Sequence, residues 1–199
     1  MMENRREFIS KSSLYGFTYL FGSPLFAFID MNNPSPQEFY FEDDGKIPNS
    51  KYPLLVYQSA FSLKGNAGAN WLEERFKANN WFNSWRWGVY PFHHYHSTTH
   101  EVLGCFQGSA LLHMGGEKGE KIQVKAGDIL IIPAGVGHKC ISHSNDFTVV
   151  GAYPNGRDWD LLKGDTDDRP MADKNIAAVP LPEKDPFTGK NDGLLALWN

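Results

Sequence analysis

The sequence predicts an all-β protein, a sandwich or barrel with one core and one short helix. Between residues 54 and 154 it carries many short apolar and β-branched runs, separated by Gly, Pro, Asn and Asp turn signals. Its 199 residues are 41% hydrophobic and 14% aromatic, which is enough for one packed domain and short for two. We therefore expect a single domain over residues 54–199.

The charge distribution excludes one class of partner. The formal net charge is -4, and no run of Lys and Arg exceeds two residues, so the sequence lacks the basic patch of a nucleic-acid-binding protein. All seven histidines lie between residues 93 and 143. We expect a small-molecule partner, and chemistry concentrated in that window.

Residues 1–29 have the features of a twin-arginine export leader. Arg5 and Arg6 are adjacent, and an apolar run broken by Gly and Pro follows from residue 14 to 29. The run is too short and too broken to span a membrane. We expect an exported, periplasmic protein without an integral membrane segment in its mature form. The alternatives are a cytoplasmic protein whose N-terminal segment packs on the domain, or a start codon assigned too early.

The first elements of the domain follow from local patterns. Residues 30–53 are rich in Pro, Asn and Asp and contain a short aromatic run, which predicts a linker with an edge strand. Residues 54–61 predict a strand. The apolar spacing over residues 68–79, ended by two asparagines, predicts the helix.

Tryptophans gather before the histidine-rich window, at positions 71, 81, 85 and 87. Large aromatic side chains usually pack a helix against a sheet. We expect packing for Trp71, Trp81, Trp85 and Trp87, with an aromatic wall around a ligand as the alternative.

From residue 101 onwards strand follows strand. Two apolar runs on either side of residues 107–109 predict a hairpin, and a polar turn leads into a strand that ends at residue 125. Residues 128–133 predict a buried strand, and residues 147–154 the last strand. Residues 155–199 predict an extended, charged tail that Trp198 pins to the domain.

Two stretches carry residues that suit a metal ion. His94 and His96 stand two apart, so in a strand their side chains point to the same face. Glu101 follows after a turn, and His138 follows a Pro/Gly turn at the end of the buried strand. Imidazoles with one carboxylate suit Fe, Mn, Ni, Cu or Zn. We therefore expect one divalent metal ion at His94, His96, Glu101 and His138.

These stretches resemble the two motifs of the cupin family. The first motif, G(x)5HxH(x)4E(x)6G, is filled by Gly88, His94, His96, Glu101 and Gly108. The second motif, G(x)5PxG(x)2H(x)3N, is filled by Gly127, Pro133, Gly135 and His138, with Ser142 in place of the final Asn. Over residues 37–199 the chain is also similar to a group of small bacterial cupins labelled YjlB-like. The resemblance implies a double-stranded β-helix, or jelly-roll barrel, whose metal-site core spans residues 88–154.

The two cysteines, Cys105 and Cys140, are too few for a disulfide framework, and no CxxC pair supports a zinc ribbon. We expect two small buried side chains. A disulfide between them, or a thiol at the site, is the alternative.

The four expected ligands leave coordination positions open, which favours catalysis over a sealed structural ion. The cupin resemblance implies a dioxygenase-like oxidoreductase; the alternatives are a non-catalytic ligand-binding protein and a sugar isomerase or epimerase. His100, as a substitute ligand or proton shuttle, and Tyr90 and Tyr153 are the candidate catalytic residues.

We expect no role at the metal site for the remaining histidines, and we expect the outer surface to form a dimer contact. His93 and Tyr95 alternate out of phase with the ligands, so we expect them at the surface or in packing, and His113 and His143 are expected to be ordinary polar positions. Cupins often pair barrels through their outer sheets, so we expect a homodimer.

Overall fold

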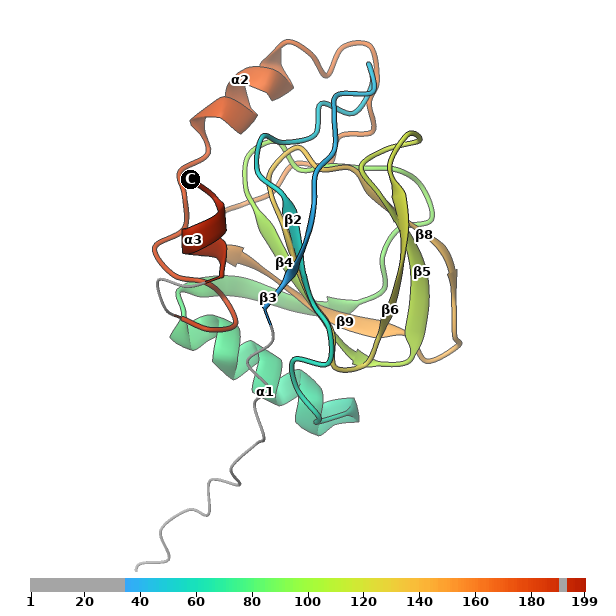
Figure 1. Cartoon of the computed structure of the whole chain (residues 1–199), viewed down its shortest axis with the longest axis vertical. Coiled ribbons are helices and arrows are strands. Elements are labelled where there is room, and N and C mark those ends of the chain that lie inside the picture. The colour runs from blue at the N-terminus through green and yellow to red at the C-terminus, as the bar shows by residue number, and fades with distance from the viewer. Residues whose placement is uncertain (1–34, 190–192) are drawn as a thin grey trace, which may run out of the picture.

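The computed structural model describes residues 35–189 and 193–199. Within them, nine strands form two antiparallel sheets that enclose a barrel (Figure 1). The six-stranded sheet has the order β1-β2-β7-β4-β9-β3, and the three-stranded sheet has the order β6-β5-β8. The predicted leader, residues 1–29, lies outside the described residues, as does the start of the predicted linker.

The strands are β1 (Gln37–Phe39), β2 (Leu54–Tyr57), β3 (Trp81–Trp87), β4 (Glu101–Gln107), β5 (Ser109–Met114), β6 (Glu120–Lys125), β7 (Ile129–Ile132), β8 (His138–His143) and β9 (Thr148–Pro154). The helices are α1 (Gly65–Ala78), α2 (Met171–Ala178) and α3 (Leu194–Leu197). The predicted β class is confirmed, and α1 is the predicted helix, begun three residues earlier.

The strands β2 and β7 of the six-stranded sheet are buried on both faces, which explains their unbroken apolar runs. Successive side chains of a strand point to opposite faces. In β2, Leu54 and Val56 join the core between the sheets, whereas Leu55 and Tyr57 join a second core beneath α1. Gly104 admits Leu72 of α1, because an added Cβ would lie 2.6 Å from Leu72 Cδ2. Helix α1 therefore packs directly on β4.

The predicted hairpin around residues 107–109 is wrong. Strand β4 pairs with β7 and β9, whereas β5 pairs with β6 and β8. Gly108 has a φ of +69° and lies where the chain leaves one sheet for the other. Such a backbone conformation favours glycine. An apolar-turn-apolar pattern does not tell a hairpin from a change of sheet, because both need the same turn residues.

The C-terminal tail is more structured than predicted, since it forms α2 and α3. The predicted anchoring by Trp198 is confirmed: its Nε1 donates to the Pro53 carbonyl at 2.9 Å, and its ring stacks on Tyr52. The buried carboxylate of Asp185 accepts hydrogen bonds from the Tyr57 hydroxyl (3.0 Å) and the Leu194 amide (2.9 Å). The tail thus closes the core beneath α1.

Both cysteines are free and buried, so the alternative of a disulfide is wrong. Cys105 packs in the core between the sheets, and burial raises the pKa of its thiol to about 12. A protonated, buried thiol behaves as a small apolar side chain.

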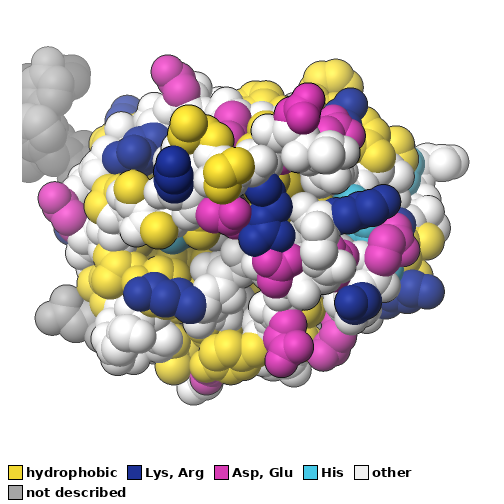
Figure 2. Space-filling view, turned by 90° about the horizontal axis from the view of Figure 1, so that it is seen from above, with side chains coloured by type: hydrophobic (Ala, Val, Ile, Leu, Met, Phe, Trp, Pro, Cys, Tyr) yellow, Lys and Arg dark blue, Asp and Glu magenta, His cyan; other side chains and the backbone are white. Residues whose placement is uncertain are grey.

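The surface is mixed in charge on the face that carries α2. Figure 2 shows acidic and basic side chains interspersed there, without a continuous patch of one sign. Across residues 35–189 and 193–199, every helix is too short or too polar to cross a bilayer.

Replacing Trp198 by Ala tests the anchoring of the tail. Truncation of a fully buried Trp should lower the free energy of unfolding by about 3 kcal/mol. The matched control is Trp87→Ala, because Trp87 is 73% exposed and its loss should change stability by less than ~0.5 kcal/mol. Urea denaturation of both variants is the measurement. Equal stabilities would show that the tail is not part of the cooperative core.

Candidate metal centre

The two motifs meet at an antiparallel bridge between His94 and His138. The His138 amide donates to the His94 carbonyl at 2.9 Å, and the His94 amide donates to the His138 carbonyl at 3.2 Å. His96 lies two residues further along the same segment. As a result, one ring nitrogen of each of the three imidazoles lies within 4.8 Å of the other two, and all three side chains are buried.

Backbone carbonyls fix the proton on each of these rings. The Nδ1 atom of every imidazole in the cluster faces a carbonyl oxygen, and a carbonyl only accepts. Each Nδ1 therefore carries the hydrogen, and a neutral ring keeps a free electron pair on Nε2. The pairs are His94 with Phe92 (3.2 Å), His138 with Val136 (3.1 Å) and His96 with Asp160.

Glu101 supplies a buried charge beside the imidazoles. Its side chain is 3% exposed, and Oε2 lies 3.4 Å from His138 Nε2 and 3.6 Å from His96 Nε2. Among the described residues, Oε2 has no hydrogen-bond partner. A buried, unpaired carboxylate oxygen costs several kcal/mol unless a cation balances it. The donor set and the unpaired oxygen together fit a divalent metal ion.

The pKa values reflect a charged carboxylate among the imidazoles. Burial acts to lower the pKa of His96, but the charge of Glu101 outweighs it and holds that pKa above its ordinary value. Burial and the neighbouring imidazoles of His138 and His96 lower the pKa of His94 to about 2, so this ring is neutral. Burial acts to raise the pKa of Glu101, but His96 and His138 outweigh it and hold that pKa below its ordinary value. Glu101 is therefore ionised.

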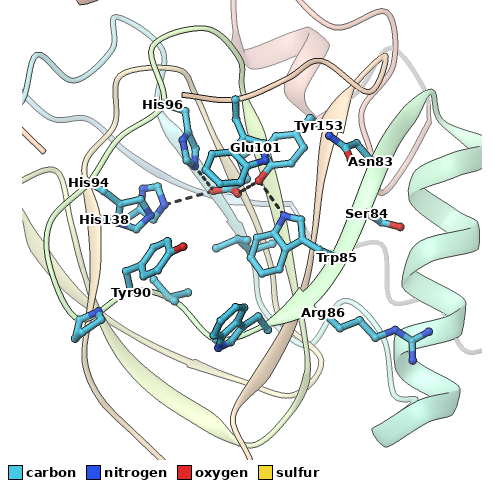
Figure 3. Close-up of a pocket in the computed structure, with 16 residues that line it drawn as sticks. Asn83, Ser84, Trp85, Arg86, Tyr90, His94, His96, Glu101, His138 and Tyr153 are labelled. Carbon is cyan, nitrogen blue, oxygen red and sulfur yellow. Dashed lines mark hydrogen bonds and ion pairs between the residues drawn. The ribbon is translucent and has the colours of Figure 1, made fainter. Parts of the chain in front are cut away.

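Two aromatic residues hold Glu101 in place from the other side (Figure 3). Trp85 Nε1 donates to the Tyr153 hydroxyl at 2.9 Å, and this hydroxyl donates to Glu101 Oε1 at 2.9 Å. The direction is fixed because an indole N–H only donates. Burial and the charge of Glu101 raise the pKa of Tyr153 well above its ordinary value. Tyr153 thus acts as a hydrogen-bond donor and is poorly suited to be a base.

A cavity of about 530 Å³ opens onto the imidazoles and Glu101 (Figure 3). Its walls are mainly apolar and aromatic and include Trp85, Trp87, Val89, Tyr90, Leu103 and Trp159. Arg86 also borders it, but its guanidinium turns towards α1 and binds Glu73 at 2.7 Å and Asn70 at 2.7 Å. Of the described residues that line the cavity, Arg86 is the one with a permanent positive charge. The cavity therefore offers an aromatic surface next to the candidate metal ligands.

The structure brings most of the predicted site residues together. His94, His96, Glu101 and His138 converge, and the candidates Tyr90 and Tyr153 line the same cavity.

His100 is placed elsewhere. Its Nδ1 accepts a hydrogen bond from the Ala134 amide at 2.9 Å, its ring lies against Trp198, and it borders a separate cavity of about 330 Å³. Burial lowers the pKa of His100 to about 3. The structure thus does not support a role for His100 as a ligand or proton shuttle at the metal centre.

The tryptophans divide between the two expected roles. Trp81 is buried in the core and Trp71 stacks on Phe61, as expected for packing. Trp85 and Trp87, on the edge strand β3, line the cavity instead. The alternative of an aromatic wall therefore holds for these two.

The tail contributes site residues that the sequence did not indicate. Trp159 lines the cavity, and the Asp160 carbonyl orients His96. The Asp160 carboxylate also accepts from the Ser97 amide at 2.6 Å, which fixes the turn after His96. Adjacent Trp and Asp residues in a charged stretch form no motif with a defined spacing. Their roles at the site therefore could not be predicted from the sequence and depend on tertiary structure.

The barrel, the two motifs and the buried cluster define a cupin. The family model described as a cupin domain matches residues 88–150. The uncharacterized protein YjlB of Bacillus subtilis (strain 168) is 48% identical over 163 residues, which cover 81% of this chain and 96% of that protein. The chain belongs to the cupin family and shares the YjlB-like branch that the sequence resembles.

Solved structures give partial matches only. Procruciferin from Brassica napus is 21% identical, with 39% of this chain and 20% of that chain covered and a TM-score of 0.32. A variant of oxalate decarboxylase from Bacillus subtilis is 17% identical, and the match covers 59% of this chain and 29% of that chain with a TM-score of 0.34. The chain spans less than a third of either protein.

Substitution of the converging side chains tests the metal centre. His96→Ala and Glu101→Gln should each abolish metal binding at the cluster, because each removes a proposed ligand. Tyr153→Phe should weaken binding by about tenfold to a hundredfold, because it removes only the partner that orients Glu101. Metal content after dialysis, with a competition titration against a chromophoric chelator, is the measurement.

The control for these variants is His143→Gln, because His143 is exposed and far along β8 from the bridge. It should retain wild-type metal content. Full retention of the metal by His96→Ala or Glu101→Gln would overturn the assignment.

Proposed function

We propose that this cupin is a metal-dependent oxidoreductase that uses dioxygen to oxidise a small, uncharged aromatic molecule. One observation carries the proposal: three buried imidazoles, each with Nδ1 against a backbone carbonyl, and an ionised Glu101 stand at one end of an aromatic-lined cavity. A redox-active divalent ion such as Fe or Mn, held by His94, His96, Glu101 and His138, would supply the activation of dioxygen and of a substrate oxygen.

The chain's own residues keep the ligand set charged and fixed. The Trp85–Tyr153–Glu101 hydrogen bonds hold the carboxylate at Oε1 and leave Oε2 directed to the imidazoles. Preorganised ligands of this kind need little rearrangement during a reaction.

The walls of the cavity favour a flat, apolar substrate. Trp85, Trp87 and Trp159 offer ring faces or edges for stacking, and Leu103 closes the inner wall. Such walls displace water from the reacting groups and align a planar ring by offset stacking.

Tyr90 supplies a polar group at the position where a substrate oxygen would lie. Its ring stands edge-on to His94, with 5.2 Å between the ring centroids, and its hydroxyl points into the cavity (Figure 3). The hydroxyl is placed to donate a hydrogen bond to a phenolic or carbonyl oxygen.

The charges around the cavity argue against an anionic substrate. Arg86 is committed to Glu73 and Asn70, and the Glu101 carboxylate repels a second negative charge unless a metal intervenes. An isomerase or epimerase is supported less well, because it needs a base and the raised pKa of Tyr153 keeps its hydroxyl protonated. Non-catalytic ligand binding would use the same cavity, and the experiments below distinguish it from catalysis.

Oxygen consumption tests the proposal. Protein loaded anaerobically with Fe²⁺ or Mn²⁺ should consume dioxygen with one or more phenols or catechols, and less with thiols or keto acids. Glu101→Gln should lower the rate by more than about a hundredfold, because it removes a ligand. Arg86→Ala should change kcat/KM by less than about twofold, because Arg86 does not face the substrate.

Tryptophan fluorescence gives the second readout, since the three indoles of Trp85, Trp87 and Trp159 line the cavity. Saturable quenching by a phenol without any oxygen consumption, with every metal tried, would favour the ligand-binding function and contradict the oxidoreductase proposal.

A further inference from the structure

A second group of metal-capable side chains lies on the outer face of the three-stranded sheet. It consists of His93, His113 and Glu117, and one ligand atom of each lies within 4.8 Å of the other two. In the register of β5 and β8, His113 is opposite Lys139, and Met114 is opposite His138. Met114 belongs to the core between the sheets, so His113 points to the other face. The outer group is therefore separated from the metal centre by the sheet itself.

His93 is the unusual member of this group. Its side chain is only 10% exposed, and among the described residues neither ring nitrogen has a hydrogen-bond partner. Buried imidazole nitrogens normally find a partner, because an unsatisfied one costs free energy. Two groups lie close to it: the ring of His113, with 4.9 Å between centroids, and Glu117 Oε1, which lies 3.4 Å from His93 Nε2.

We propose that His93, His113 and Glu117 bind a second divalent metal ion, of the Zn²⁺ type, on the outside of the barrel. Two imidazoles and one carboxylate are a donor set that zinc accepts, with water in the remaining position. Glu117 is 71% exposed at its side chain, so the ion and its water reach the site from solvent. The proposal does not depend on the proposed oxidoreductase activity.

Lys139 competes with the ion. Its Nζ lies 2.7 Å from Glu117 Oε1, so without a metal this lysine neutralises the carboxylate. The lysine side chain is 22% exposed and has a route to solvent when the ion takes its place. Lys139 therefore weakens metal binding at the outer site.

Binding at the outer site would join three segments of the chain. His93 precedes His94 directly, His113 is the last but one residue of β5, and Glu117 lies in the turn between β5 and β6. An ion that holds these segments together stabilises the folded state by mass action. It also fixes the backbone that presents His94 to the inner centre.

Calorimetric titration of the full chain with Zn²⁺ tests the proposal. Wild type should bind two equivalents of Zn²⁺. Glu117→Gln and His113→Gln should each bind one, at the inner centre, and Glu101→Gln should bind one, at the outer site. In the Glu101→Gln background, Zn²⁺ should raise the thermal unfolding midpoint, and adding Glu117→Gln should remove that rise. Because Glu117 is exposed, its substitution leaves folding intact even if His113→Gln does not fold.

Two matched controls complete the design. His143→Gln should keep two equivalents, and Lys139→Met should tighten the outer site by about fivefold, whereas Lys125→Met on β6 should not. The proposal would be overturned if wild type binds a single equivalent that is lost in Glu101→Gln, or if a second equivalent survives Glu117→Gln and is lost in His143→Gln. The latter result would mean an adventitious ion only. Neither result changes the expectation for the inner centre.

Discussion

The negative charge of Glu101 is buried inside the barrel, and the need to neutralise it constrains the side chains around it. One carboxylate oxygen accepts a hydrogen bond from the Tyr153 hydroxyl. The other faces His96 and His138 and has no hydrogen-bond partner among the described residues. Since such a charge costs several kcal/mol without compensation, a cation at this point would stabilise the fold. The three imidazoles would then be its ligands through Nε2, and the cavity beside them would be the place where a bound molecule meets the cation.

The positions of these ligands depend on parts of the chain that are far apart. The bridge between His94 and His138 brings the two motifs together, and carbonyls fix the protons on Nδ1. For His96 the carbonyl belongs to Asp160, in the C-terminal tail. The tail is in turn anchored through Asp185 and Trp198 to the core beneath α1. Stability of the tail and geometry of the site are therefore coupled.

The sequence predicted the β class, α1 and the convergence of the site, because strand parity and turn residues are local properties. His94 and His96 share a face for this reason, and the Pro/Gly turn brings His138 to them. The change of sheet at Gly108 was not predictable, because a turn signal does not specify the partner of the next strand. Trp159 and Asp160 were missed because their roles arise only after the tail has folded back. His100 was predicted at the site but lies at a separate cavity, because adjacency to Glu101 in sequence does not fix the direction of its side chain.

The central claim is that backbone carbonyls set the tautomer of three histidines so that their Nε2 atoms share one ion. Long-range ¹H–¹⁵N correlation spectra of the Zn²⁺-loaded protein, labelled at histidine, report the tautomer of each ring directly. The account predicts that His94, His96 and His138 all carry hydrogen on Nδ1, with Nε2 shifts that change on Zn²⁺ addition and do not change in Glu101→Gln. Hydrogen on Nε2 of any of these rings in the loaded protein, or no shift on Zn²⁺ addition, would contradict it.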